Sequence, residues 1–286
     1  MINYNSASCL RAFLDKNGLG MQKKFGQNFL INPALRKTLV ETLKAPAGGT
    51  VWEIGAGLGA MTRLLLDSGL KVSAFEIDRG FAKILRELFS GDDGFSLVEG
   101  DVLKTWHEQP AADYLLGNLP YNIASALLAD FIENGRFFKR MVVTVQHEVA
   151  LRMIAAAGTK NYSSFSVLCA SVYRVKPLAV IKAASFYPRP RVDSRGVLLE
   201  LREDAVSDPP PCFYLLLRRL FSSRRKTVKN NLEEFISSGG CLAGRTGKAG
   251  LIADEVLERN GISGSLRPEN LTCEDFLVLA KTIEDM

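Results

Sequence analysis

The chain has 286 residues, of which 47% are hydrophobic and 23% charged, a balance typical of globular proteins. This composition excludes wholesale disorder, collagen-like repeats and coiled coil, and no apolar run approaches the roughly 18 residues of a membrane-spanning helix. Lys and Arg total 36 against 31 Asp and Glu, so the formal net charge is only +5 and its meaning depends on where the charges lie. The length predicts one large domain and a smaller one.

Cysteine and histidine usage narrows the chemistry further. The five cysteines are scattered singly, without a C-x-x-C pair, and the chain has two histidines, so we expect no metal site and no redox dithiol. The odd cysteine count argues against a disulfide framework, and the N-terminal residues lack the pattern of a secretory signal. We therefore expect a cytoplasmic protein. His107 and His147 are expected to pack or to lie at the surface, with catalysis as the alternative.

Short apolar strands alternate with helical spacing through the first half of the chain. Helices are predicted at 60–66, 81–89 and 124–132. The predicted strands are 50–54 (TVWEI), 71–76 (KVSAFE), 95–99 (FSLVE), 113–117 (DYLLG) and 139–146 (KRMVVTVQ). Because parallel neighbours need a crossover connection, this alternation predicts βαβ units. The fold up to about residue 200 is therefore predicted to be doubly wound α/β with a parallel sheet.

Two further β-rich runs, 167–175 and 194–202, flank a loop that contains Pro and Arg, and we predict that they form an antiparallel pair at one edge of the sheet. After them the segment EDAVSDPPP has the composition of a linker, and the residues beyond this segment have helical spacing between Gly-rich turns. We predict an α/β domain at 1–207, with an N-terminal extension at 1–22, and a helical C-terminal domain at 208–286.

A glycine-rich turn comes after the first predicted strand of the sheet. Residues 53–60 read EIGAGLGA, and glycine permits a tight turn and close approach of a ligand. Glu76 ends the next strand, where a carboxylate can accept hydrogen bonds from both hydroxyls of a ribose, and Asp101 comes after the third strand, where it could accept from an adenine amine. This pattern predicts an adenosine site and leaves NAD and S-adenosylmethionine (SAM) both open. The alternative is that the glycines only turn the chain and the carboxylates cap helices.

The segment NLPY comes directly after the fourth predicted strand. The amide oxygen of Asn118 and the carbonyl of Leu119 can accept the two hydrogens of an exocyclic amine, while Pro120 fixes the backbone and Tyr121 offers a flat face to a base. An amine held in this way turns its lone pair toward an electrophile such as a sulfonium methyl group, and direct displacement needs orientation rather than a strong base. The alternative is an ordinary strand-to-loop turn with a partly buried Tyr.

Seven motifs in order show a resemblance to a known family over roughly residues 23–231. They are KKFGQNFL at 23–30, EIGAGLGAMT at 53–62, FEID at 75–78, EGDVL at 99–103, NLPYN at 118–122, FYPRPRVDS at 186–194 and LFSSRRKTVKNNL at 220–232. In these motifs the chain resembles the ribosomal RNA adenine dimethyltransferases, and within them the small-subunit branch, KsgA/RsmA. The resemblance implies a Rossmann-like SAM-dependent methyltransferase domain with a small C-terminal all-helical domain.

The resemblance also implies an activity and a set of site residues. The activity is SAM-dependent dimethylation of the N6 amines of two adjacent adenosines near the 3′ end of small-subunit (16S) rRNA, in ribosome biogenesis, by a monomer. The implied cofactor-binding residues are Gln27, Asn28, Leu30, Gly55, Gly57, Glu76, Asp101 and Asn118. The implied catalytic residues are Asn118, Leu119, Pro120, Tyr121 and Phe186. Phe186 would pack on the face of the flipped base opposite Tyr121, and its alternative is a place in the core.

Four positions depart from the family pattern. Ala56 stands where proline is common in the glycine turn, Ala124 and Ala126 replace a hydroxyl residue and a proline after NLPYN, and His147 replaces a lysine. None of these departures removes a group to which chemistry is assigned. They affect the expected rigidity of loops and local RNA contacts.

Basic residues concentrate in two places. Residues 213–231 carry six basic residues and no acidic one, and the loop around 182–195 carries four with only Asp193 opposing. Such clusters predict phosphate contacts, and the alternative for the first is a solubilising face. The predicted RNA-binding residues are Arg189, Arg191, Arg218, Arg219, Arg224, Arg225, Lys226 and Lys229. Lys23 and Lys24 add charge at the first motif, whereas residues 250–286 are acidic on balance and are a poor RNA candidate.

Three rival functions remain at this point. The nearest is methylation of large-subunit RNA, as in the antibiotic-resistance branch of the same family, although LFSSRRKTVKNNL resembles the small-subunit branch. A second rival is an assembly factor that binds RNA without turnover, which the intact NLPY segment argues against. The third is an NAD-dependent dehydrogenase, which the glycine turn alone permits but which leaves NLPY and the basic clusters unexplained.

Overall fold

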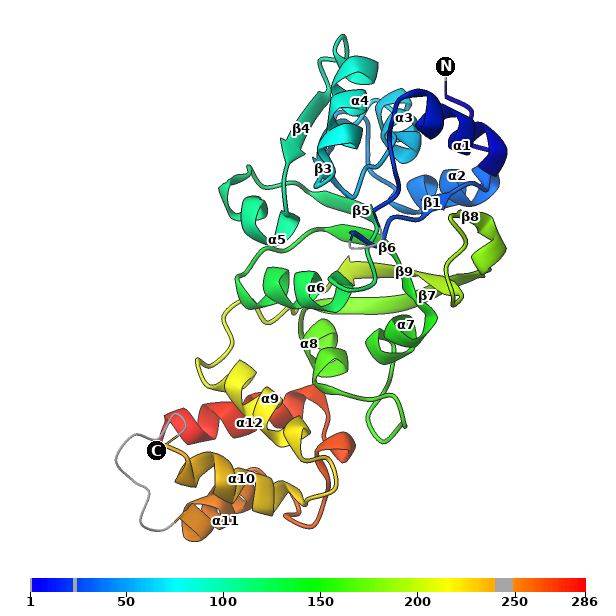
Figure 1. Cartoon of the computed structure of the whole chain (residues 1–286). Coiled ribbons are helices and arrows are strands. Elements are labelled where there is room, and N and C mark those ends of the chain that lie inside the picture. The colour runs from blue at the N-terminus through cyan, green and yellow to red at the C-terminus, as the bar shows by residue number, and fades with distance from the viewer. Residues whose placement is uncertain (1, 23–24, 240–248) are drawn as a thin grey trace. The chain divides into compact units, whose positions relative to one another are not determined.

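The computed structural model describes residues 2–22, 25–239 and 249–286, and the predicted contributions of Lys23 and Lys24 lie outside them. The chain folds into two compact units (Figure 1). The first contains Met1–Ala150 and Arg174–Leu201, and the second contains Leu151–Tyr173 and Arg202–Met286. This partition differs from the predicted division at residue 207, because residues 151–173 cluster with the C-terminal helices. Among the described residues, no helix is long and apolar enough to cross a membrane.

A seven-stranded sheet forms the centre of the first unit, in the order β4-β3-β2-β5-β6-β9-β7. The first five strands in this order pair in parallel, and β9 is antiparallel to β6. The strands are β2 (Thr50–Ile54), β3 (Lys71–Glu76), β4 (Phe95–Glu99), β5 (Tyr114–Asn118), β6 (Arg140–Gln146), β7 (Tyr173–Ile181) and β9 (Ser194–Leu201). The parallel α/β sheet predicted from the alternating pattern is thus confirmed.

The connections of the sheet define where a ligand binds. From β2 the chain runs outward through β3 to β4, then returns to β5 on the other side of β2. The carboxyl ends of β2 and β5 therefore lie at a topological switch point, where open α/β sheets bind ligands. The helices that make the crossovers are α3 (Ala60–Asp67), α4 (Arg79–Phe89), α5 (Val102–Thr105) and α6 (Ala124–Glu133), and α3 and α4 pack against β3 and β4 (Figure 1).

Aromatic and aliphatic side chains fill the space beside the sheet. Trp52 on β2 is 1% exposed and packs edge-on against Phe75 and Phe138, with ring centroids 5.0 and 5.4 Å away. Burying each such ring stabilises the fold by a few kcal/mol, because each Å² of apolar surface removed from water contributes ~25 cal/mol. This packing fixes β2 and β3, whose carboxyl ends carry the glycine turn and Glu76.

The N-terminal extension folds onto the same unit. It contains α1 (Ala7–Lys16), and the chain continues through β1 (Phe29–Leu30) to α2 (Pro33–Thr42). Leu10 and Leu14 of α1 are buried in one cluster with Leu58, which lies in the glycine turn, and with Phe81 on α4. The extension is therefore packed against two elements that border the switch point.

One predicted strand is wrong. Residues 167–172 belong to α8 (Ser164–Val172), and the strand β7 begins only at Tyr173. Ser163 caps this helix together with Ser166 in a capping box, and almost every side chain from Phe165 to Val172 is buried. A short apolar run without polar alternation does not distinguish a buried helix from a buried strand, which is why the periodicity misled. The strand that lies next to β9 at the edge of the sheet is β7.

The second unit is helical, as predicted for the C-terminal part. Its helices are α8, α9 (Phe213–Ser222), α10 (Val228–Ser237), α11 (Ala249–Arg259) and α12 (Cys273–Glu284), with a short 3-10 turn at Pro268–Asn270. α9 buries Phe213, Leu216, Leu217 and Leu220, spaced as one apolar face of a helix. The apolar spacing that predicted these helices matches their core-facing side only in part, since Leu216 and Leu220 are buried whereas Leu215 and Leu251 are 51% and 64% exposed.

Candidate active site

A pocket lies at the switch point and collects most of the predicted cofactor residues. Its walls come from the segment 25–29, from the ends of β2, β3 and β4, and from the residues after β5. The predicted residues that line it are Gln27, Asn28, Gly55, Gly57, Glu76, Asp101, Asn118 and Pro120. Leu30 lines a smaller hollow beside it, which shares Asn28, Gly55 and Asn118. Segments separated by up to about ninety residues thus converge on one cavity, as expected for strand ends.

The glycine turn leaves room for a ligand. Gly55 has φ of 74° and Gly57 has φ of 59°, in the left-handed region that disfavours other residues. A Cβ on Gly57 would lie 2.9 Å from the ring of Phe29, and a Cβ on Gly55 would lie 3.8 Å from the carbonyl oxygen of Asn118. A side chain at Gly57 would clash with the Phe29 ring, and one at Gly55 would extend toward Asn118, so both would narrow the pocket that these residues line.

Glu76 is a buried carboxyl group at the wall of this pocket. It is 5% exposed, its Oε2 accepts a hydrogen bond from the Gly57 N–H at 2.7 Å, and its Oε1 accepts from the Asp78 N–H at 2.8 Å. Burial raises the pKa of Glu76 to about 7, although these two hydrogen bonds lower it. Each oxygen keeps a further lone pair, so the carboxylate can still accept two ribose hydroxyls. The free lone pairs of the Glu76 carboxylate and the glycine cradle therefore fit an adenosine-type cofactor.

Glu53 is a second buried carboxyl group, to which the sequence assigned no binding role. It lies on β2 directly before the glycine turn, is 1% exposed and accepts a 2.6 Å hydrogen bond from Thr62 Oγ1. Burial and, to a smaller degree, the nearby Glu76 raise its pKa to about 8, although hydrogen bonds from Thr62 lower it. It lines the smaller hollow with Leu30. Its place before the glycines was the only signal in the sequence.

The NLPY segment holds Asn118 in one orientation. The Nδ2 of Asn118 donates to the carbonyl oxygen of Asn28 at 2.6 Å, so its Oδ1 is left as the acceptor at the pocket. The Leu119 N–H donates to the Thr144 carbonyl at 3.0 Å, and the Leu119 side chain is fully buried. Pro120 lines the pocket itself. The first motif thus orients the Asn118 amide and β6 holds the Leu119 backbone N–H, whereas Leu119 is not among the residues that line the pocket.

Tyr121 is held by its hydroxyl group. Its Oη lies 2.6 Å from Oγ of the buried Ser194, and burial raises the pKa of the phenol, so the group stays neutral. Beyond Ser194, the Asp193 carboxylate accepts from Lys182 at 2.9 Å, and the Asp193 backbone carbonyl accepts from the His147 N–H. In the part of the chain that the structure describes, the buried Oγ1 of Thr144 and Nδ1 of His147 have no hydrogen-bond partner.

Phe186 lies in the core. The short strand β8 (Phe186–Tyr187) pairs with β1, Phe186 stands opposite Leu30, and its side chain is 3% exposed. The structure thus brings Phe186 to the first motif, which corresponds to the core alternative, and neither Phe186 nor Tyr121 is among the residues that line the pocket. The pairing of β8 with β1 holds Leu30 in the core, and it thereby holds the preceding residues 25–29, which line the pocket.

The predicted RNA-binding residues differ in their exposure and in their contacts. Arg189, Arg191, Arg219 and Arg225 are exposed. Three others have carboxylate partners within the second unit: Arg224 pairs with Glu269 at 2.6 Å, Lys229 with Asp254 at 2.6 Å, and Lys226 with Glu234. Arg218 donates to the Tyr214 carbonyl. The partners come from helices further along the chain, so the absence of acidic residues within 213–231 did not reveal them.

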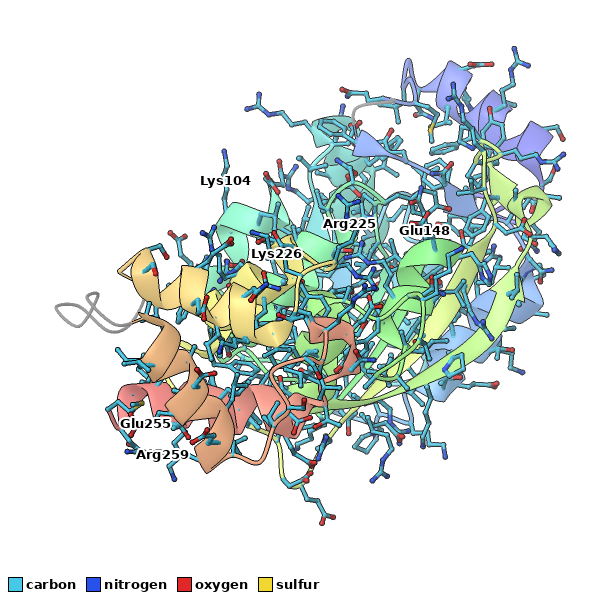
Figure 2. The ribbon with its side chains drawn as sticks, turned by 90° about the horizontal axis from the view of Figure 1, so that it is seen from below. Lys104, Glu148, Arg225, Lys226, Glu255 and Arg259 are labelled. Atoms are coloured by element: carbon cyan, nitrogen blue, oxygen red, sulfur yellow. The ribbon has the colours of Figure 1, made fainter. Side chains whose placement is uncertain are left out.

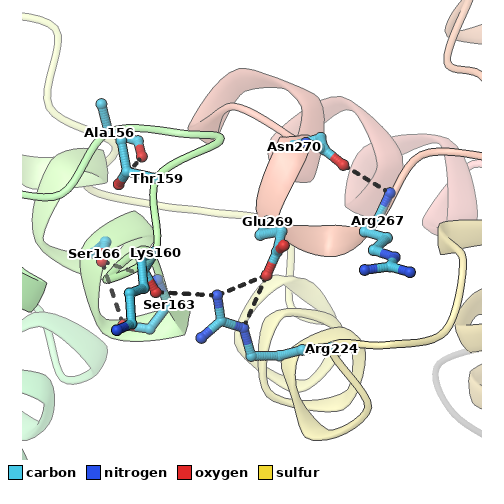
Figure 3. A network of polar contacts seen from close by, with 9 residues as sticks. All are labelled: Ala156, Thr159, Lys160, Ser163, Ser166, Arg224, Arg267, Glu269 and Asn270. Carbon is cyan, nitrogen blue, oxygen red and sulfur yellow. Dashed lines mark hydrogen bonds and ion pairs between the residues drawn. The ribbon is translucent and has the colours of Figure 1, made fainter.

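Arg224 has the most extensive contacts of this group (Figure 3). Its Nε and Nη2 both donate to Oε2 of Glu269, and Nη2 also donates to the Lys160 carbonyl. The Gly158 N–H donates to the Glu269 carbonyl at 2.6 Å, which ties the same loop to the turn before α12. By contrast, Arg225 and Lys226, labelled in Figure 2, are exposed in the turn between α9 and α10. Arg224 is therefore mainly a structural residue of the second unit.

An amide acceptor fixed beside an adenosine-type pocket, at the switch point of a mostly parallel sheet, has the chemistry of a methyltransferase that acts on an amine. The fold and the site thus define a Rossmann-like methyltransferase.

Residues 18–250 match the family described as ribosomal RNA adenine dimethylase, and the chain belongs to this family. The ribosomal RNA small subunit methyltransferase A of Treponema denticola is 44% identical over 290 residues, which cover 98% of this chain and 96% of that protein. The crystal structure of a dimethyladenosine transferase from Plasmodium falciparum has a TM-score of 0.75 at 29% identity and covers 87% of this chain and 94% of its own.

The 23S rRNA methyltransferase ErmE has a TM-score of 0.65 over 89% of this chain and 99% of its own, at 22% identity, and this likeness shows the fold alone. Membership of the family confirms the predicted enzyme class, an rRNA adenine dimethyltransferase that uses SAM, and the predicted fold. The NAD-dependent dehydrogenase and the non-catalytic factor are accordingly set aside. The individual site residues remain predictions.

Proposed function

We propose that the chain dimethylates the N6 amines of two adjacent adenosines near the 3′ end of small-subunit (16S) rRNA, as a step in ribosome biogenesis, and that it does so as a cytoplasmic monomer. The observation that carries the amine chemistry is the orientation of Asn118, whose Nδ2 is committed to the Asn28 carbonyl and whose Oδ1 is therefore an acceptor. The choice of the small subunit is supported by the name of the Treponema denticola relative.

The roles of the catalytic residues are inferred from their contacts. Asn118 Oδ1 and the Leu119 carbonyl would accept the two amine hydrogens, Pro120 would fix the spacing of these acceptors, and Tyr121 would stack on the flipped adenine. SAM supplies the methyl group on a positively charged sulfur. Since neither acceptor is a strong base, the amine proton is lost after transfer, when the methylated nitrogen carries a positive charge and is acidic.

Phe186 acts in this proposal from behind the site. Its pairing with Leu30 holds the segment that contains Asn28, whose carbonyl orients Asn118. A sandwich of the adenine between Tyr121 and Phe186 would require Phe186 to leave the core when RNA binds.

The cofactor would be held by the lining residues of the pocket. The Glu76 carboxylate would accept the ribose hydroxyls and Asp101 the adenine amine, while Gly55 and Gly57 allow the backbone to approach. Gln27, Asn28 and Leu30 would form the wall opposite, and Asn118 would separate the cofactor from the target base.

Exposed arginines would contact RNA phosphates on each unit. Arg189 and Arg191 lie in the loop after β8, and Arg219 and Arg225 lie on and after α9. The pair of Lys226 with Glu234 is exposed, and exposed ion pairs are weak because water screens the charges, so a phosphate can replace the carboxylate as the partner of Lys226. A phosphate could replace Asp254 at Lys229 in the same way, since both side chains of that pair are partly exposed, whereas Glu269 and the Lys160 carbonyl hold Arg224 in the fold.

The experiment that tests the proposal uses purified protein, labelled SAM and separated ribosomal subunits from cells that lack the modification. We expect label in the small-subunit RNA and none in the large-subunit RNA. Label found only in the large subunit would replace the proposal by the resistance-type activity. Free 16S rRNA, assayed beside the subunit, tests whether the substrate must be partly assembled.

A further inference from the structure

A buried carboxyl group connects the N-terminal segment to the cofactor pocket. Asp78 lies two residues beyond the end of β3 and is 5% exposed. Its Oδ2 accepts from Gln22 Nε2 at 2.9 Å and from Gln27 Nε2 at 3.0 Å. Its Oδ1 accepts from the Gly80 N–H at 2.9 Å and caps α4. One oxygen thus serves the helix and the other serves two glutamines.

The same residue contacts the proposed ribose-binding carboxyl group. The Asp78 N–H donates to Glu76 Oε1 at 2.8 Å, while the Gly57 N–H donates to Glu76 Oε2 at 2.7 Å. A continuous chain of hydrogen bonds therefore runs from the two glutamines through Asp78 to Glu76 and the glycine turn.

The two glutamines hold one wall of the pocket. The Oε1 of Gln27 accepts from the Gln22 N–H at 2.8 Å, so the two residues are bonded to each other as well as to Asp78. Gln27 lines the pocket together with Phe25, Gly26 and Asn28. At its far end this wall is fixed again, because the Asn28 carbonyl accepts from Asn118 at 2.6 Å. The wall is therefore fastened on the ribose side by Asp78 and on the amine side by Asn118.

The preceding extension is anchored on the same elements. Tyr4 Oη donates to the Leu58 carbonyl in the glycine turn at 2.8 Å, and the guanidinium of the buried Arg36 donates to the Tyr4 and Leu30 carbonyls at 3.3 and 2.6 Å. Leu14 of α1 packs with Phe81, whose helix Asp78 caps. The extension and the wall thus share their supports with the cofactor pocket.

We propose that Asp78 is a positioning residue for the cofactor, which fastens the N-terminal wall at residues 25–28 over the pocket and aligns Glu76, so that the cofactor leaves only when the bonds of Asp78 to the glutamines break. The inference rests on the proposed function, in that the pocket binds an adenosine-type cofactor. It gives the N-terminal extension a role in retention of that cofactor.

Asp78→Asn separates the two tasks of this side chain. Asn keeps Oδ1 as the cap of α4 and replaces Oδ2, the acceptor of the two glutamines, by an NH₂ group that cannot accept. Gln22→Ala removes one donor from the other side and leaves the helix cap untouched. Gln109→Ala is the matched control, since the side chain of this glutamine donates to the Thr105 carbonyl at 3.5 Å and does not line the pocket.

The test measures binding of S-adenosylhomocysteine by titration calorimetry and its dissociation rate by stopped flow. We expect Asp78→Asn to weaken binding about tenfold or more, chiefly through faster dissociation, and Gln22→Ala to do so by a smaller factor. With saturating SAM, kcat should stay within about threefold of the unsubstituted enzyme while KM for SAM rises. Gln109→Ala should change none of these values.

Hydrogen exchange provides a readout besides activity. In the unsubstituted protein, S-adenosylhomocysteine should slow exchange of the amides of residues 25–30, and this protection should be lost in Asp78→Asn while α4 amides stay protected. Unchanged affinity and dissociation in both Asp78→Asn and Gln22→Ala would overturn the inference, and Gln22→Ala decides if the Asp78 variant does not fold. Failure of the unsubstituted protein to bind S-adenosylhomocysteine would instead contradict the proposed cofactor site.

Discussion

Cofactor affinity should depend on pH through Glu76. Burial raises the pKa of this carboxyl group to about 7 in the protein without cofactor. Ribose hydroxyls donate hydrogen bonds. An ionised carboxylate can accept them on both oxygens, whereas protonation occupies a lone pair on one oxygen and turns that oxygen into a donor. Binding therefore selects the ionised form and releases a proton, so affinity should rise as pH increases through about 7.

The size of the effect depends on the fraction of ionised Glu76. With a pKa of about 7, roughly 3% of Glu76 is ionised at about pH 5.5 and nearly all of it at about pH 8.5. Affinity should therefore rise on the order of 30-fold as the pH is raised from the lower value to the higher one. That factor corresponds to about 2 kcal/mol, since one pKa unit is about 1.4 kcal/mol. Had Glu76 its ordinary pKa, the affinity would change by no more than about 10% over the same range.

The assay is titration calorimetry with 5′-methylthioadenosine, which contains the ribose and adenine but no titrating amino acid group in this range. Glu76→Gln should bind weakly with a flat pH profile, whereas Glu53→Gln should keep the slope, because Glu53 lines the neighbouring hollow. Repeating the titration in buffers of different ionisation enthalpy should show the released proton. A flat profile in the unsubstituted protein, or an unchanged slope in Glu76→Gln, would refute the reasoning.

Further outcomes are expected from the same contacts. Asn118→Ala should lower the methylation rate by about a thousandfold or more, because it removes a transition-state acceptor, while binding of 16S rRNA stays within about threefold; equal rates in a single-turnover assay would contradict this. Arg224→Ala should lower the free energy of unfolding by about 1 kcal/mol in urea, since its ion pair with Glu269 is partly exposed. Arg225→Ala should weaken RNA binding in a filter assay while the free energy of unfolding falls by no more than about 0.5 kcal/mol. Because the pKa of Glu53 is raised, the free energy of unfolding should fall as pH rises from about 5 through about 8. In urea unfolding, Glu53→Gln should lose less of this free energy over the same range, and a larger loss in the variant would contradict the assignment.

Much of the first unit was predictable because its signals are local. Each predicted strand from 50–54 to 139–146 matches an observed strand to within one residue at either end, since apolar runs separated by amphipathic helices specify βαβ units. The same topology brought Glu76, Asp101 and Asn118 to one pocket, because the ends of parallel strands meet at one edge.

What escaped the sequence depends on contacts made over long separations. Almost every side chain from Phe165 to Val172 is buried, so only the capping serines Ser163 and Ser166 marked this part of the segment as a helix. The partner of Arg224 lies 45 residues away at Glu269, so a cluster that reads as unopposed charge is partly a structural network. The hydrogen bonds of Asp78 with Gln22 and Gln27 span more than fifty residues, and no periodicity in the sequence predicts them.

The function proposed for this site is the conversion of adjacent adenines of small-subunit RNA to their dimethylated form. Mass spectrometry of RNA fragments from unmodified small subunits, incubated with the protein and SAM, identifies both the modified base and its position. We expect two neighbouring N6,N6-dimethyladenosines near the 3′ end of the 16S rRNA. Dimethyladenosine absent from that fragment, with methyl groups found instead on another RNA or at another atom of the base, would contradict the proposed function.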